Sequence, residues 1–332
     1  MIKLAVATLT SFAIAAAVMP LVILLGKRLK VRQTILSYVD NHIGKSGTPT
    51  MGGIGIMLAL TVCCLAFSRG SNRLMLVTLL VTLGYGIIGF IDDFIKVRFK
   101  QNKGLSPIQK IIFQLLIAAI VAVFAYNDAR VGSVIYLPFT LREVNIGLWS
   151  IPLFMVVFLA LTNSVNLTDG LDGLAGKVSM SYTFFFAAVL AIAVYSVYGG
   201  QAESEHANLI LYCCTLIGAL AGFMCYNCYP AKVFMGDTGA LALGGGLGAL
   251  AVMSRLELIV PIIGIMFVVT SVSVIIQVVY FKATKKRIFL MAPLHHHFER
   301  KGVHENRIVT VYTAVTSAVG ILTVLLTFVF VL

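Results

Sequence analysis

Long apolar runs alternate with short polar segments along the whole chain. A helix that crosses a bilayer needs about 20 apolar residues, and ten segments reach or approach this length. In order they are Leu4–Gly26, Met51–Phe67, Leu74–Ile91, Ile108–Tyr126, Leu148–Leu167, Val178–Tyr198, Asn208–Tyr226, Thr238–Ser254, Glu257–Phe281 and Ile308–Leu332. The pattern predicts an all-α integral membrane protein with about ten transmembrane helices, in a single polytopic domain over residues 1–332.

Composition supports this interpretation. The chain is 59% hydrophobic and only 11% charged, and the charged share is less than half of the roughly 25% found in soluble domains. The eighth run is the weakest because it contains Gly244, Gly245 and Gly246. Glycines of this kind let a membrane helix pack closely against a neighbour.

The Lys and Arg residues are distributed unevenly between the two sets of loops. Of the 25, six fall on one side, namely Lys3, Arg69, Arg73, Arg130, Arg142 and Arg255. Because cytoplasmic loops carry an excess of Lys and Arg, we expect both termini outside and the opposite loops in the cytoplasm. This bias accounts for the net charge of +12, so no nucleic-acid partner is expected, although the same charge would suit an anionic substrate from the cytoplasm.

The outer connections and the cysteines show no arrangement that predicts chemistry. The longest outer connection, Asn127–Gly147, alternates over Val131–Thr140 around Pro138, which is typical of a small hairpin. The six cysteines lie in or beside apolar runs and match no zinc spacing, so we expect them to be small core residues.

Two adjacent carboxylates, Asp92 and Asp93, end the third run. Buried without partners they would cost several kcal/mol, so they need a cation or water. Neighbours on a helix diverge by about 100°, which predicts different partners for the two side chains. A solvated helix end with an Asp–Lys pair is the simpler alternative for this pattern alone.

Polar residues recur at every third position where the fifth run ends. They are Asn163, Asn166, Asp169 and Asp172. On a continuous helix this spacing places them on one slowly winding stripe, and the glycines that follow could open the helix end so that backbone groups approach a ligand. A single Asn in a span often joins two helices, but four such residues favour a binding site.

Two further inner segments have the composition of phosphate or cation sites. Asp237 stands between glycines at the start of the eighth run, where it is placed either to bind a cation or to cap the helix, and a helix N-terminus favours bound phosphate. The segment Lys45–Gly53 contains a lysine, hydroxyls including Thr50, and turn-forming residues that suit phosphate binding through backbone N–H groups. It lacks the order and spacing of a P-loop.

Three consecutive histidines, His295, His296 and His297, lie in the last inner loop. Consecutive residues of a regular helix or strand cannot all bind one ion, so contacts with phosphate or sugar are favoured over a transition-metal site.

Taken together, these loops indicate a magnesium-dependent reaction of a phosphorylated substrate. Five of the 13 acidic residues fall at inner ends of the predicted spans. Carboxylates, amides and lysines without a plausible His/Cys cage are typical of Mg²⁺ sites. Chemistry at a membrane face further predicts one soluble substrate and one lipid-borne substrate.

At these residues the sequence closely resembles the phospho-N-acetylmuramoyl-pentapeptide transferase (MraY) family of the polyprenyl-phosphate N-acetylhexosamine-1-phosphate transferases. The resemblance covers nearly the whole chain, and the motifs that carry it are Lys45–Gly53, Asp92-Asp93, Asn163–Leu174, Phe234–Gly239 and Pro293–Glu299. The Asp-Asp and Asn-rich motifs are similar to the wider superfamily. The Pro-Leu-His-His-His-Phe-Glu run narrows the match to the muramoyl-pentapeptide enzymes.

The resemblance implies ten transmembrane helices in the bacterial inner (cytoplasmic) membrane, commonly a homodimer, with a cytoplasmic active site and Mg²⁺ dependence. It implies transfer of phospho-MurNAc-pentapeptide from UDP-MurNAc-pentapeptide to undecaprenyl phosphate in the lipid bilayer, which gives lipid I and UMP. This is a step of peptidoglycan synthesis, and hence of cell-wall biogenesis, cell shape and cell division.

The resemblance also implies roles for single residues. Asp237 resembles the magnesium ligand, with Asn166 and Asp169 expected nearby, and Phe234 resembles the aromatic side chain that stacks on uracil. The remaining implied positions are Lys45, Thr50, Asn163 and Asp172 in the nucleotide region, Asp92, Asp93, Lys96 and Lys110 at the polyprenyl phosphate, and His295, His296 and His297 near the sugar phosphate.

Two alternatives remain at this stage. A sister transferase would move GlcNAc-1-phosphate from UDP-GlcNAc, and the histidine run argues against it. An ion-coupled transporter would place polar residues near mid-membrane and show an inverted repeat. Here the acidic residues lie at span ends and no repeat is visible.

Overall fold

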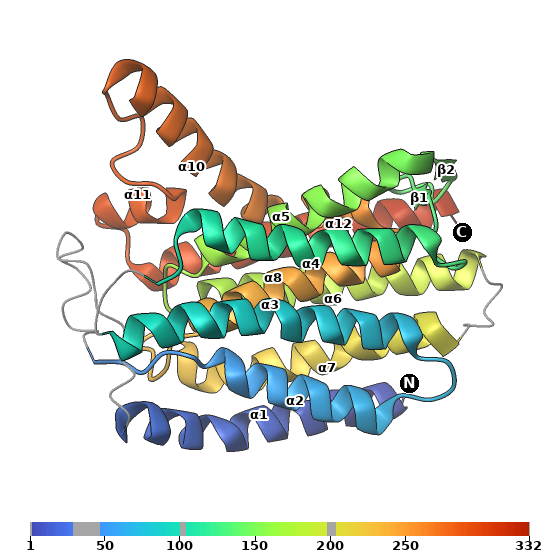
Figure 1. The fold of residues 1–332 in the computed structure, drawn as a ribbon, viewed down its shortest axis with the longest axis horizontal. Helices are drawn as coiled ribbons and strands as arrows, with labels where there is room; N and C mark the ends of the chain where they lie inside the picture. Colours follow the sequence, from blue (N-terminus) through green and yellow to red (C-terminus); the bar gives the residue numbers. More distant parts are fainter. Residues whose placement is uncertain (1, 29–46, 100–103, 198–203, 332) are drawn as a thin grey trace.

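The computed structural model describes residues 2–28, 47–99, 104–197 and 204–331 as a bundle of α-helices that lie side by side (Figure 1). Within these ranges nine helices are long and apolar enough to cross a membrane, and a tenth apolar helix, α2, has 15 residues. The bounds are α1 Ile2–Arg28, α2 Gly53–Phe67, α3 Arg73–Arg98, α4 Pro107–Asn127, α5 Ser150–Thr168, α6 Leu174–Val197, α7 Ser204–Asn227, α8 Gly236–Met253, α10 Ile265–Thr284 and α12 Glu305–Val331. The prediction of a multi-pass, largely helical membrane protein is confirmed, with α2 shorter than a full crossing.

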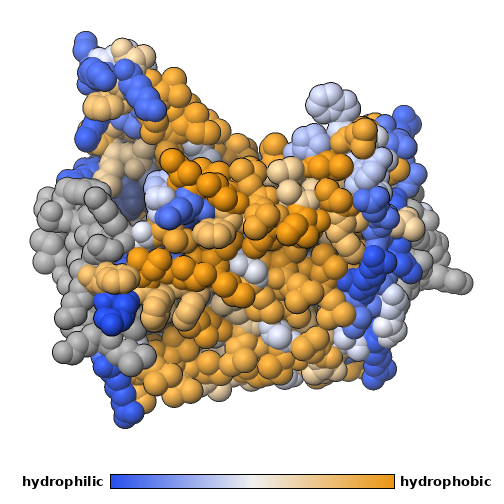
Figure 2. Space-filling model, in the orientation of Figure 1, coloured by the Kyte–Doolittle hydropathy of each residue, from blue (hydrophilic) through white to orange (hydrophobic). Residues whose placement is uncertain are grey.

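The surface has the polarity that a bilayer requires. Figure 2 shows an apolar band across the middle of the bundle, with hydrophilic residues gathered toward its two ends. The first residues of α1 and the last residues of α12 lie at the same end of the bundle (Figure 1). The start of α1 and the end of α12 therefore lie on one side of the apolar band.

Helix α8, which has the weakest span pattern in the sequence, is the most enclosed helix of the bundle. Within its best membrane-spanning window 89% of the residues are buried, against 22–67% for the other eight spans among the described residues. It packs chiefly against α3 and α5. The glycines allow this contact: a Cβ on Gly244 would lie 2.4 Å from the backbone of Thr162 in α5, and one on Gly245 would lie 2.4 Å from the ring of Tyr85 in α3.

The ninth predicted span is wrong as a single continuous helix. Glu257–Ile259 forms a 3₁₀ turn, α9 covers Val260–Ile263, and α10 begins only at Ile265. Pro261 stands in the first turn of α9 and Gly264 separates the two helices. Hydropathy does not register such a break, because the residues on both sides of it are apolar.

A small hairpin forms in the connection between α4 and α5, as the sequence predicts, but its second strand lies further along the chain. Strand β1 covers Val134–Tyr136 and pairs antiparallel with β2, Glu143–Asn145. Pro138 falls between the strands, in the connection that reverses the chain. The hairpin lies at the same end of the bundle as the two ends of the chain (Figure 1).

The close contact between α8 and α3 predicts that Gly245→Ala destabilises the protein. The new methyl group would overlap the Tyr85 ring, and overpacking of this kind costs about 1–3 kcal/mol. Gly84→Ala is the matched control, because its nearest neighbour would be the flexible end of Ile117 at 3.3 Å. Thermal unfolding of the purified proteins in detergent should show a lower midpoint for Gly245→Ala only. Equal midpoints for the two variants would contradict the packing described here.

Candidate functional site

The loops that the sequence singled out meet at the end of the bundle opposite the hairpin. The ends of α3 and α5, the start of α4 and α8, and the short helix α11, Leu294–Arg300, all lie there (Figure 1). Segments from five separate parts of the chain thus converge on one region at the edge of the apolar band.

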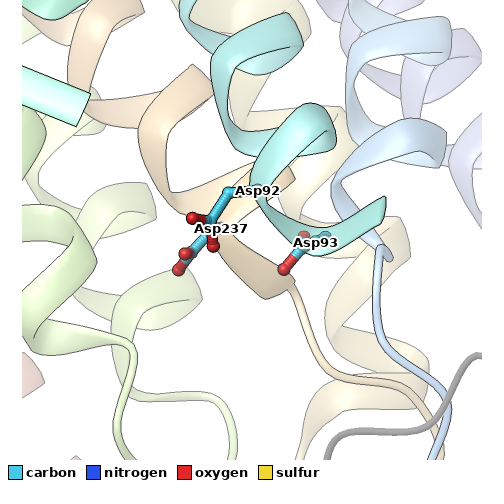
Figure 3. Close-up of side chains that lie close together, drawn as sticks. All are labelled: Asp92, Asp93 and Asp237. Carbon is cyan, nitrogen blue, oxygen red and sulfur yellow. The ribbon is translucent and has the colours of Figure 1, made fainter. Parts of the chain in front are cut away.

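Three carboxylates form the centre of this region. Asp92 and Asp93 lie in the C-terminal part of α3, and Asp237 lies in the first turn of α8. Each side chain offers an oxygen, and these oxygens lie within 4.8 Å of one another. Figure 3 shows the three side chains together where the two helices cross. We call these three residues the carboxylate cluster.

Asp93 caps the N-terminus of α8 from the neighbouring helix. Its Oδ2 accepts hydrogen bonds from the backbone N–H of Thr238 at 2.9 Å and from the Thr238 hydroxyl at 2.7 Å. The first N–H groups of a helix have no partner within the helix, and its N-terminus favours negative charge. Gly236, with φ +74, makes the turn into α8, and a Cβ there would meet Asp93 and Thr50 at 2.6 Å. The cap and the turn therefore fix where Asp93 and Asp237 stand.

Two lysines neutralise the other two carboxylates. Lys96 Nζ lies 2.6 Å from Asp92 Oδ2 and 2.9 Å from Asp237 Oδ2. Lys110 Nζ lies 3.1 Å from Asp92 Oδ1 and 2.7 Å from Asp237 Oδ2. Asp92 also accepts a hydrogen bond from the backbone N–H of Leu105. The principal partners of Asp92 and Asp93 differ, as predicted, although Lys96 also lies 4.0 Å from Asp93.

The donor set of the cluster fits a hard divalent cation. Three carboxylates against two lysines leave one negative charge in excess. Oxygen ligands from carboxylates are those that Mg²⁺ takes in proteins. Asp93 Oδ1, 4.0 Å from Lys96, is the oxygen of that carboxylate that Thr238 does not use. Among the described residues, this is the group of acidic, His and Cys side chains close enough to hold a metal.

The polar stripe of the fifth run is divided between α5 and the turn after it. Asn166 Nδ2 donates to Asp237 Oδ1 at 2.8 Å, so it belongs to the cluster. Asn163 instead donates to Gln114 of α4 at 2.9 Å, which joins two helices one turn away. The helix ends at Thr168, and Asp169 is its C-cap residue.

Asp169 is a mostly buried carboxyl group beside other acidic groups. Burial raises its pKa from 3.8 to about 8, and the negative charges of Asp237, Asp93 and Asp172 raise the pKa in the same direction. A raised pKa of this kind favours the protonated carboxyl group, or the binding of positive charge beside it. Asp169 lies outside the carboxylate cluster, but the charges of Asp93 and Asp237 in that cluster affect its pKa.

Asp172 organises the loop after α7 from its position in the turn. Its Oδ2 accepts a hydrogen bond from the backbone N–H of Ala231 at 2.9 Å, and its own N–H donates to Glu305 at the start of α12. The buried Asp172 side chain therefore ties the turn after α5 to the loop that leads to α8.

Phe234 and Thr50 lie on two segments held together by backbone hydrogen bonds. Phe234 N–H donates to Pro49 O at 2.8 Å, and Gly52 N–H donates to Phe234 O at 2.9 Å. Thr50 is buried and stands beside Gly236. Lys45, the other residue predicted in this segment, lies outside the described residues.

The histidines lie on α11 next to the turn that follows Asp169. A Cβ on Gly170 would lie 2.3 Å from His295 Nε2 and 3.1 Å from His296 Nε2. His295 is buried, His296 Nδ1 lies 2.9 Å from Glu299 Oε2, and His297 Nδ1 accepts from Leu290 N–H at 3.1 Å. The rings of His295 and His296 are therefore in contact, with their centroids 4.4 Å apart, whereas the ring of His297 is bonded toward Leu290.

Several residues that build the site were not predicted from the sequence. Thr238 holds Asp93, Gln114 pairs with Asn163, and Asn227 at the end of α7 accepts from Gly173 N–H and donates to Val233 O. Gln114 and Asn227 are polar residues within or at the end of apolar runs, which is the signal that could have identified them. Thr238 carries no such signal, because hydroxyl groups in membrane helices commonly bond their own backbone.

Comparison with known proteins agrees with this geometry. A family model described as glycosyl transferase family 4 matches residues 75–255, a range that contains the carboxylate cluster. The fold and the site therefore define a multi-pass membrane protein of glycosyl transferase family 4. Within that class, the chain belongs to the phospho-N-acetylmuramoyl-pentapeptide-transferase family, as its curated relatives show.

Three of these relatives illustrate the extent of the similarity, and each carries the name phospho-N-acetylmuramoyl-pentapeptide-transferase. The relative from Clostridium novyi (strain NT) is 42% identical over 309 residues, which cover 93% of this chain and 92% of the relative. The relative from Clostridioides difficile (strain 630) is 39% identical over 327 residues, 98% of each chain. The relative from Geobacillus sp. (strain WCH70) is 43% identical over 314 residues, 93% of each chain. The similarity therefore extends to nearly the whole chain, including α11.

The raised pKa of Asp169 predicts a specific pH dependence of stability. Because the folded protein holds this proton more tightly than the unfolded chain, wild-type stability should fall as pH rises from about 4 to 8, by at most about 1.4 kcal/mol per pH unit. Asp169→Asn should lose this contribution. The unfolding midpoints of wild type and Asp169→Asn, measured from pH 5.5 to 8.5 in the presence of a chelator, should therefore diverge. As pH rises, the midpoint of the variant should increase relative to that of wild type. Parallel curves would contradict the raised pKa.

Proposed function

We propose that this protein transfers phospho-MurNAc-pentapeptide from UDP-MurNAc-pentapeptide to undecaprenyl phosphate in bacterial peptidoglycan synthesis, with lipid I and UMP as products. The observation that carries the proposal is the carboxylate cluster with Lys96 and Lys110, at the edge of the apolar band, in a chain of this family. A site at that level can take a soluble nucleotide and a lipid phosphate together. The sister reaction with UDP-GlcNAc has no comparable support.

The proposal includes a location and an orientation. The positive-inside bias supports a cytoplasmic active site in the bacterial inner membrane, with both ends of the chain outside. Convergence of the motif loops opposite the two chain ends is consistent with that arrangement. A homodimer, common in the family, belongs to the proposal as well.

Asp237, Asp92 and Asp93 would hold Mg²⁺, with Asn166 orienting Asp237 and Asp169 close enough to sense the added charge. Mg²⁺ held by these residues would supply positive charge against the negative charge that develops on the departing UMP. Asp93 is fixed by Thr238 and Asp237 by Asn166, so the ligand oxygens are held before any substrate binds. Pre-orientation of this kind reduces the cost of assembling the site during the reaction.

Lys96 and Lys110 would bind and orient the incoming lipid phosphate. Each lysine bridges Asp92 and Asp237. Their positive charges therefore offset the carboxylate charges that would otherwise repel a phosphate. Both lysine side chains are partly exposed. The phosphate therefore meets two cations at the boundary between the bilayer and the site.

We infer direct displacement rather than a covalent enzyme intermediate. A phosphate monoester has a second pKa near 6 and is largely dianionic at neutral pH, so the acceptor needs little activation. Its oxygen attacks the phosphorus that bears the sugar, the bond from that phosphorus to the bridging oxygen breaks, and UMP leaves with the bonding electrons. Asp92 is paired with two lysines and Asp93 with Thr238, which supports a positioning role for both over nucleophilic attack.

The nucleotide would lie against the segments that Phe234 and Thr50 share. Phe234 is partly exposed and its backbone is held at both N–H and C=O, so its ring is available for stacking on uracil. Asp172 and Lys45 belong to the same proposed region, with Asn163 supporting Asn166 from one turn away. His295, His296 and His297, beside Gly170, are proposed to contact the sugar phosphate.

The function and the metal site are tested together by an assay with UDP-MurNAc-pentapeptide, undecaprenyl phosphate and Mg²⁺. Wild type should release UMP only when all three are present. Asp237→Asn should lower kcat by about 10²–10³-fold, a loss typical of removing one electrostatic group at a reacting centre. Asp128→Asn, which removes a buried carboxylate paired with Arg73, is the control and should keep near-normal activity per folded molecule. A near-normal rate for Asp237→Asn with an unchanged Mg²⁺ requirement would move the metal elsewhere.

The stacking role of Phe234 predicts a selective loss of nucleotide affinity in Phe234→Ala. Stacking of an aromatic side chain on a base is worth about 1–3 kcal/mol, so the KM for UDP-MurNAc-pentapeptide should rise by about one to two powers of ten. The KM for undecaprenyl phosphate should change little, and Phe234→Trp should retain most of the affinity. An equal rise for both substrates would indicate general damage to the loop.

A further inference from the structure

A second binding feature lies away from the carboxylate cluster, between the C-terminal half of α1 and the end of α7. It is an open groove with a volume of about 490 Å³. One part of its wall is apolar and is formed by Pro20, Ile23, Leu24 and Tyr226. Helix α1 lies at the edge of the bundle beside α7 (Figure 1). Pro20 and Leu24 of the groove wall are exposed on α1.

The mouth of the groove is cationic. Lys27, in the last turn of α1, and Lys232, in the loop after α7, both line it, together with Thr48. Both lysines are exposed, and neither forms an ion pair with a described residue. Among the residues that the structure describes, the lining contains no acidic side chain. Two ammonium groups and a hydroxyl at one end of a groove match the charge and hydrogen-bonding capacity of a phosphate group.

The polar and apolar parts of the groove are arranged along the membrane normal. Leu24 and Pro20 precede Lys27 by three and seven residues on the same helix, which places them about 5 and 10 Å deeper along the axis. A ligand that uses both parts must therefore carry a phosphate at the membrane surface and a hydrocarbon chain below it. A free phosphate or a nucleotide would leave the apolar wall unused.

We propose that this groove is a specific site for one anionic phospholipid of the surrounding bilayer. The volume suits a phosphate headgroup and the upper part of its chains, since pockets for molecules of that size measure about 300–1,000 Å³. Basic residues close to a membrane helix attract anionic headgroups. The site is separate from the one that binds the acceptor in the proposed reaction.

A lipid in this groove would brace the segment that carries Thr50. Pro49 lines the groove, and α1 presses on it so closely that a Cβ on Gly26 would lie 2.8 Å from its Cβ. Pro49 O in turn accepts the hydrogen bond from Phe234 N–H at 2.8 Å. A lipid bound in the groove would therefore contact Pro49, which is hydrogen-bonded to the backbone of Phe234 in the proposed nucleotide region.

The test is binding of dioleoyl-phosphatidylglycerol to the full-length protein, counted by native mass spectrometry in a neutral detergent. Wild type should bind one copy more tightly than further copies, and should prefer it to dioleoyl-phosphatidylcholine. Lys27→Gln with Lys232→Gln should weaken that first copy about thirtyfold, and each single variant about fivefold. Lys285→Gln with Lys286→Gln is the control, because it removes the same charge from exposed lysines after α10 and should leave the first copy unchanged.

A second variant tests the apolar part without touching either lysine. Leu24→Trp fills the exposed side of the groove and should displace phosphatidylglycerol while the unfolding midpoint in detergent alone stays near that of wild type. Unchanged binding in the double lysine variant, or an equal loss in the control, would overturn the site. Displacement of the first lipid by inorganic phosphate would also overturn the site. A change of oligomeric state in one of these variants would overturn it too, because a second copy of the chain would then be the occupant of the groove. Because binding is measured without turnover, these outcomes are independent of the proposed reaction.

Discussion

Negative charge placed at the end of an apolar bundle is the constraint on which the site depends. Asp92, Asp93 and Asp237 are mostly buried, and in such surroundings each carboxylate must find a cation or hydrogen-bond donors. The protein meets this need from three directions: the N-terminus of α8 through Thr238, the two lysines of α3 and α4, and the amide of Asn166. The same contacts that make the charges tolerable also set their relative positions.

Much of the arrangement could be predicted from the sequence because it follows from local patterns. The apolar runs indicate the number and order of the membrane helices, and the acidic residues at the run ends indicate where chemistry gathers. The helical offset between Asp92 and Asp93 correctly predicts that their principal partners differ, although Lys96 lies within reach of both. The family to which the chain belongs was also predicted, since its motifs are short and lie at these same ends.

What could not be predicted are contacts between residues distant in the chain. Asn163 and Asn166 look equivalent in sequence, yet only Asn166 reaches Asp237, because α4 places Gln114 opposite Asn163. The break at Gly264 was missed because apolar residues continue across it. Asp169 was expected with Asp237 at the metal, whereas the structure brings Asp92 and Asp93 closest to Asp237. The carboxylate oxygens that come together are determined by how separate helices pack, which cannot be read from any one apolar segment of the sequence.

The enclosed position of α8 has a consequence for how the chain is made. A helix rich in glycine and alanine enters a membrane less readily than one rich in leucine, and almost none of the surface of α8 would meet lipid in the finished protein. Its principal neighbours, α3 and α5, both precede it in the chain. Helices α3 and α5, against which α8 packs, are therefore already synthesised when the residues of α8 leave the ribosome. Helix α8, the least hydrophobic of the described spans, can thus be inserted against protein rather than against lipid. The order of the helices in the chain therefore also favours their order of assembly in the membrane.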